Sequence, residues 1–182
     1  MLRIFVPADN EFMADLLWMQ SCYYFGEHFL TDRKYDLLDE YLELIIELAP
    51  KWKRPYSFAA IIFPLEAGDV DKGLEFLDKA IERHPDVWRF PFYKGVYLMQ
   101  YKGDMEQAGT ILHKAASLPG APEYLSRLSA TLATKAGRRR LARRFLRDAL
   151  ERAGDPKQRK AIQIKLKELM QDDEHGTAVE GR

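Results

Sequence analysis

Cysteine is almost absent from this sequence of 182 residues, since Cys22 is the only one. A single cysteine cannot form an intramolecular disulfide, and it cannot supply a CxxC pair or a zinc ribbon. This usage suits a reducing compartment, but exported bacterial proteins without disulfides share it.

Long apolar runs are also missing. No stretch approaches the roughly 18 apolar residues that indicate a membrane span. The opening segment, Met-Leu-Arg-Ile-Phe-Val-Pro, is too short for a signal peptide with an apolar core. We therefore expect a cytoplasmic protein as the chain stands, and a periplasmic or envelope-associated one if an anchor lies upstream.

Catalytic motifs are absent as well. The sequence holds no HExxH, GxSxG, P-loop or GxGxxG pattern. Of the four histidines only His28 lies near Cys22, and six residues place the two about 240° apart around a helix. We expect Cys22 to be a buried packing residue, and the carboxylates between Asp36 and Glu47 to cover a solvated helix face. The sequence predicts no enzyme, no catalytic residue, no cofactor and no metal.

What the chain does contain is apolar residues in abundance, together with unevenly spread charge. Hydrophobic residues make up 47% and aromatic residues 12%, which is enough for a sizeable core. The 28 basic and 28 acidic residues cancel, yet residues 138–167 hold 12 basic and only 3 acidic side chains. This basic segment is the main charge feature of the chain.

A pattern of glycine, alanine and proline recurs about every 35 residues. Gly68-Asp69 is followed by Gly73, Leu77, Ala80 and Pro85. Gly103-Asp104 is followed by Ala108, Leu112, Ala115 and Pro119, and Gly137 by Ala142, Leu146 and Ala149. Leu38, Leu42, Ile45 and Pro50 fit the same spacing one period earlier.

Each period predicts a helical hairpin. The first helix carries large apolar residues at helical spacing, a glycine turn follows, and the second helix carries small residues where two helices approach. The sequence therefore predicts an all-α fold, an α-solenoid of about four hairpins with a C-terminal capping helix over 156–171. We expect an N-terminal arm at 1–13, a repeat domain at 14–171 and a disordered tail at 172–182. Strand is expected at most at Ile4-Phe5-Val6.

These residues resemble the tetratricopeptide repeat family. The resemblance rests on Gly26 and Gly95 in the first helices, and on the alanines and prolines of the second helices, over roughly residues 18–152. The segment from Ala14 to His28 is also similar to bacterial envelope-associated repeat proteins, in which it follows a hydrophobic anchor. The resemblance implies a protein-binding scaffold whose partner is a peptide segment or a helix of another protein.

In this family the concave face is lined by the first helix of each hairpin. Carried over to this chain, the resemblance implies a partner groove at Tyr23, Glu27, Phe58, Ile62, Leu65, Arg89, Phe92, Val96, Met99, Tyr124, Arg127 and Thr131. An apolar groove suits a hydrophobic helix or an extended segment. The alternative is that these residues bury against the chain's own N-terminal arm or C-terminal helix.

A second surface lies on the basic segment. Its outer positions are Arg138, Arg139, Arg140, Arg143, Arg144 and Arg147. These arginines could meet phosphates or an anionic membrane, and that would make the chain a nucleic-acid or anionic-surface binding repeat protein. The alternative is a solvated face paired with acidic residues, among them Asp172, Asp173 and Glu174. Base-stacking aromatic residues are not interleaved here, so we expect protein binding rather than nucleic-acid binding.

Overall fold

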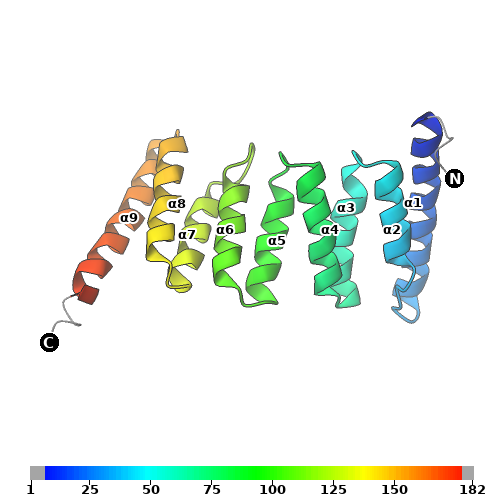
Figure 1. The fold of residues 1–182 in the computed structure, drawn as a ribbon, viewed down its shortest axis with the longest axis horizontal. Helices are drawn as coiled ribbons and strands as arrows, with labels where there is room; N and C mark the ends of the chain where they lie inside the picture. The colour runs from blue at the N-terminus through cyan, green and yellow to red at the C-terminus, as the bar shows by residue number, and fades with distance from the viewer. Residues whose placement is uncertain (1–6, 178–182) are drawn as a thin grey trace. The chain divides into compact units, whose positions relative to one another are not determined.

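The structure is a computed structural model that describes the backbone of residues 7–177 and the side chains of residues 10–170. The chain forms two compact units, residues 1–85 and residues 86–182. The elements of the first unit are α1 (Pro7–Leu30), α2 (Leu38–Leu48), α3 (Lys53–Ile62), the π-helical turn η1 (Phe63–Ala67) and α4 (Val70–Arg83). Those of the second are α5 (Arg89–Gln100), α6 (Met105–Ala116), α7 (Tyr124–Lys135), α8 (Arg139–Arg152) and α9 (Pro156–Thr177) (Figure 1).

Every regular element in residues 7–177 is a helix, which confirms the predicted all-α fold class. Within each unit the helices pack in chain order: α1 on α2, α2 on α3 and α3 on α4 in the first, and α5 through α9 in succession in the second. The predicted series of four helical hairpins and a final helix is confirmed, with hairpins α1–α2, α3–α4, α5–α6 and α7–α8.

The recurring glycine-aspartate pair explains where two of the second helices begin. Gly68 and Gly103 adopt φ values of 73° and 66°, in the left-handed region that glycine reaches without a steric penalty. The aspartate that follows caps the next helix. Asp69 accepts a hydrogen bond from the Lys72 amide at 2.9 Å, and Asp104 accepts one from the Gln107 amide at 2.9 Å. Two adjacent residues therefore supply both the turn and the cap.

The first hairpin makes its turn without glycine. Arg33 takes the left-handed conformation with φ 55°, and its amide donates to the His28 carbonyl at 2.8 Å. The Asp32 carboxylate accepts from the Lys34 amide at 3.1 Å and fixes the next step of the chain. A side-chain hydrogen bond thus helps to hold a turn that the other hairpins obtain from glycine.

Small residues lie where consecutive helices approach most closely, as predicted. Ala80, Ala108, Ala115 and Ala142 are fully buried. Gly109 of α6 shows how little room there is, because a Cβ atom there would lie 3.1 Å from the Ser129 carbonyl oxygen of α7. The backbones themselves are in contact, so the spacing of these helices depends on residue size.

The π-helical turn at the end of α3 was not predicted, and its cause is Pro64. Proline has no amide hydrogen and its ring clashes with the carbonyl four residues earlier, so a regular helix cannot continue through it. The widened turn ends at Gly68, and the Asp69 amide closes it by donating to the Phe63 carbonyl at 2.8 Å. Gly73 of α4 packs directly on the Pro64 ring, since a Cβ there would lie 2.3 Å from Cγ.

Two boundary predictions are wrong in part. Residues 7–13, expected in an extended arm, belong to α1, because Pro7 suits the first turn of a helix and no breaker follows it. Residues 172–177, expected in a disordered tail, continue α9, because the chain has no glycine or proline between Pro156 and Gly176. Ile4-Phe5-Val6 and residues 178–182 lie outside the described residues.

The contact between Gly73 and Pro64 gives the first prediction. Gly73→Ala should lower the free energy of unfolding by about 1–3 kcal/mol, the usual cost of overpacking, because a proline ring cannot swing aside. The matched control is Gly26→Ala in α1, where a Cβ meets nothing within 4 Å. That variant should be neutral or gain up to about 1 kcal/mol from better helix propensity. Urea unfolding followed by circular dichroism measures both, and equal effects would contradict the packing described.

Candidate partner-binding surfaces

The first group of predicted groove residues forms a stripe on α3 and η1. Phe58, Ile62 and Leu65 are spaced four and three residues apart, so they share one helix face. Leu65 is 61% exposed, whereas Phe58 and Ile62 are half-buried. Phe58 makes edge-on contacts with Trp18 and with Phe25 of α1, each at 5.3 Å between ring centroids. Part of this stripe therefore serves the packing of the unit itself, and its C-terminal end is open.

Tyr23 and Glu27 do not join that stripe. They line a separate hollow of about 440 Å³ between α1 and α2, together with Tyr24 and Tyr41. Tyr23 is two residues from Phe25, or about 200° around α1, so the residue that contacts Phe58 and the one predicted to share its groove point in opposite directions. The groove residues predicted for the first unit therefore lie in two places. Phe58 packs against one face of α1, and Tyr23 and Glu27 lie on another face of that helix.

The second unit carries a longer stripe on α5. Arg89, Phe92, Val96 and Met99 follow one another at helical spacing, and none is buried. Trp88, which was not among the predicted positions, extends this stripe by one residue. Its ring meets Phe92 at 5.8 Å, and the Arg89 guanidinium lies 4.9 Å from its centroid. The signal was available in the sequence, because Trp88 lies four residues before Phe92.

The remaining predicted positions are on α7. Tyr124 is 47% exposed, Arg127 is exposed and Thr131 is half-buried. The Thr131 hydroxyl donates to the Arg127 carbonyl of its own helix at 2.9 Å, so its proton is already used in a hydrogen bond within α7. All twelve predicted groove residues are at least partly accessible within the described residues, and none is a fully buried core residue.

The arginine-rich outer face of α8 is exposed along most of its length. Arg138 pairs with Glu106 of α6 at 2.8 Å, and Arg144 lies over the Phe145 ring at 5.9 Å. Arg139 and Arg143 also make contacts. Part of this charge is therefore neutralised within the unit. The side chains of Asp172, Asp173 and Glu174 lie outside the described residues.

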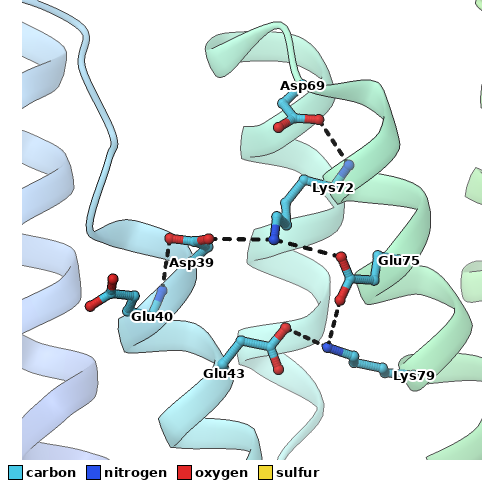
Figure 2. Close-up of polar contacts among 7 residues, drawn as sticks. All are labelled: Asp39, Glu40, Glu43, Asp69, Lys72, Glu75 and Lys79. Carbon is cyan, nitrogen blue, oxygen red and sulfur yellow. Dashed lines mark hydrogen bonds and ion pairs between the residues drawn. The ribbon is translucent and has the colours of Figure 1, made fainter.

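Two of the carboxylates predicted to lie on a solvated face, Asp39 and Glu43, are engaged with α4 instead, whereas Asp36, Glu40 and Glu47 are exposed as predicted. Figure 2 shows Asp39 and Glu43 turned toward α4, where they meet Lys72 and Lys79. Lys72 Nζ lies 3.4 Å from Asp39 and 3.6 Å from Glu75, and Lys79 Nζ lies 2.9 Å from Glu75 and also contacts Glu43. Alternating charges thus link α2 and α4 in a continuous network, in which Asp39 and Glu43 are each paired with a lysine.

Cys22 differs from expectation, and two of the histidines have partners of their own. Cys22 is exposed rather than buried, although partial desolvation still raises the pKa of its thiol. His28 pairs with Asp32 at 2.6 Å and not with Cys22. His113 is stacked on Phe145 with a ring separation of 4.0 Å, and its Nε2 lies 3.1 Å from Asp148. No nucleophile and base meet at these positions.

Metal sites and membrane spans can be judged for the part of the chain that the structure describes. No group of three or more His, Cys, Asp or Glu side chains there is arranged to hold a metal ion. None of the helices described combines the length and apolarity needed to cross a bilayer.

Comparison with known proteins gives a faint likeness in fold. A scan against models of protein families finds no match, and a search of curated proteins finds none either. Among solved structures, the crystal structure of a thermophilic tetratricopeptide repeat protein from Thermus thermophilus is similar. It is 13% identical with a TM-score of 0.43, and the match covers 91% of this chain and 99% of that one. The assignment of a helical-hairpin fold therefore rests on the helices described above.

The charge network between α2 and α4 predicts how the stability of the protein changes as the pH is lowered. The hydrogen bond from Lys79 lowers the pKa of Glu75 below its ordinary value of 4.5. A carboxylate with a lowered folded-state pKa stabilises the fold above 4.5 and loses that contribution as pH falls below it. Lys79→Met should cost about 1 kcal/mol or less at pH 7, because the pairs are partly exposed. The difference from the unchanged protein should shrink at about pH 3, as measured by urea unfolding. Lys165→Met, which breaks one local pair in α9, is the control and should change less.

His113 predicts that stability also depends on pH in a second range, between about pH 5 and pH 7. Desolvation, assisted by the Arg152 charge, lowers the pKa of His113 below its ordinary 6.5. The unfolded chain then binds more protons than the folded one just below that value, so stability should fall as pH drops from about 7 toward about 5. His113→Gln should flatten that dependence in thermal or urea unfolding. An unchanged slope in the variant would show that other groups cause it; His28→Gln, at an exposed pair, is the matched control.

Proposed function

We propose that this protein is a non-enzymatic scaffold that binds another protein through the apolar stripes of its first helices. The observation that carries the proposal is the partial exposure of long apolar side chains at helical spacing on both α3–η1 and α5. Leu65 in the first unit and Phe92 in the second are the central contacts. Such rows of anchors spaced three and four residues apart suit an amphipathic helix or an extended apolar segment of the partner.

The stripe on α5 favours a partner segment that carries both apolar and charged side chains. Trp88 and Phe92 offer aromatic edges and faces, while Arg89 adds a positive charge stacked on Trp88. Tryptophan and arginine are among the residue types that most often dominate the energetics of protein interfaces. A partner segment with apolar side chains and an acidic residue near Arg89 fits this chemistry.

The alternative function, binding of nucleic acid or an anionic surface through α8, rests on the arginines of its outer face. Its support is weaker, because Arg138 and Arg144 are already engaged with Glu106 and Phe145. Binding of this kind would weaken steeply as salt is raised, whereas apolar anchoring would not.

The proposal is tested with a partner captured from cell extract and then purified. Leu65→Gln and Phe92→Ala should each weaken its binding about 10- to 100-fold, since each anchor contributes roughly 1.5–3 kcal/mol when buried. Ile164→Gln is the matched control, because Ile164 is also an exposed apolar residue, 52% accessible, but lies on α9. Calorimetric titration in low and high salt measures the change.

The opposing variant is Arg140→Glu with Arg147→Glu, at two exposed positions of α8. If this pair abolishes binding while Leu65→Gln and Phe92→Ala leave it intact, with all proteins folded by circular dichroism, the site moves to the arginine face. A binding constant that falls steeply with salt in the unchanged protein would point the same way.

A further inference from the structure

Helix α1 is apolar on two opposite faces. Its inner face packs into the first unit, with Ala14 and Ser21 fully buried and Trp18 and Phe25 against α3. The outer face points about 150° away and is also apolar. Its members, with their exposed fractions, are Phe12 (62%), Leu16 (38%), Met19 (64%), Tyr23 (76%) and Leu30 (81%). An apolar stripe on a helix normally packs against a partner, and nothing in the described residues covers this outer face.

The spacing of the outer stripe is that of a coiled-coil seam. Positions 12, 16, 19, 23, 26 and 30 alternate steps of four and three residues, which is the heptad pattern that brings two helices together. Gly26 occupies one of these positions, and a Cβ there would meet nothing within 4 Å. The helix has 24 residues, so this seam runs most of its length.

We propose that the outer stripe of α1 binds the same stripe of a second copy of this chain, antiparallel, as a two-fold symmetric dimer. In one antiparallel register, every residue of the stripe faces a stripe residue of the second copy. Phe12 then faces Leu30 of the second copy, Leu16 faces Gly26, and Met19 faces Tyr23. Because the arrangement is symmetric, each of these pairs occurs twice.

Residue size decides for the antiparallel register. A parallel pairing would set each residue against itself, so the Gly26 layer would hold two glycines and leave a gap, while the Tyr23 layer would hold two bulky rings. The antiparallel register places Leu16 over Gly26, so a large residue fills the space that glycine leaves, and it avoids setting Tyr23 against Tyr23.

The flanking positions bring no like charges together. In this register Asp15 lies across from Phe29 of the second copy and Glu27 across from Met13, so no two carboxylates face each other. Gln20 and Cys22 lie beside the two-fold axis and meet their own counterparts. A lipid surface suits the stripe less, because Pro7–Leu30 contains no lysine or arginine to meet anionic headgroups.

The first test is sedimentation velocity over a range of protein concentrations. We expect a reversible dimer in the unchanged protein. Met19→Glu should weaken the dimer by roughly a hundredfold or more, because an unpaired charge would be enclosed in the seam. Ile164→Glu, at a comparably exposed apolar position on α9, should leave it unchanged. A monomer at every concentration would overturn the proposal, and so would a dimer whose dissociation constant does not change in Met19→Glu.

The second test fixes the register by exchange of charge. Tyr23→Lys alone should also dissociate the dimer, but an equal mixture with Met19→Glu should restore association, because positions 19 and 23 face each other only in the antiparallel pair. The single cysteine gives an independent readout. A short bis-maleimide should link Cys22 to Cys22 in the unchanged protein and fail in Cys22→Ser. Failure of both the mixture and the cross-link would overturn the antiparallel dimer even if some other dimer were present.

Discussion

Close approach of consecutive helices is the constraint on which the rest of this structure depends. No hairpin here is large enough to enclose a core alone, so each helix must bury its apolar face on its neighbours along the chain. Ala80, Ala115 and Ala142 are fully buried for that reason, and at Gly109 the backbones of α6 and α7 touch. Larger residues at these points would separate the helices and expose the leucines that flank them.

This constraint also explains the pairing of Pro64 with Gly73. The proline ends the regular part of α3 in a wide turn, and its ring lies against Gly73 of α4. Only glycine leaves room for that ring, and the charge network from Asp39 to Lys79 then ties α4 to α2. A backbone irregularity in one helix is thus absorbed by a residue choice in the next.

The sequence was a good guide to the helices and a weaker guide to their faces. Gly68-Asp69 and Gly103-Asp104 act locally, as a left-handed turn and a cap, so their roles could be predicted without tertiary structure. Residues 7–13 were misjudged because Phe12 belongs to an outward stripe, whereas the repeat pattern marks inward-facing positions. Repeat positions alone could not show that Tyr23 points away from the face of α1 that contacts Phe58. Cys22 was expected to be buried by residue type, whereas its place on the helix, about 100° from Ser21, leaves it exposed.

The two faces of α1 have different physical consequences. The inner face is occupied by the unit's own aromatic side chains, so any partner that binds near Phe58 must accommodate Trp18 and Phe25, which are already packed there. The heptad spacing of the outer face matches another helix rather than an extended segment. Pairing of α1 with its own copy would use neither Leu65 of η1 nor Phe92 of α5, the two side chains on which the proposed partner site rests. A dimer of such a scaffold would hold two partner segments. Its affinity for a target that carries both segments would rise, because the second segment binds at a high effective concentration and no new contact is needed.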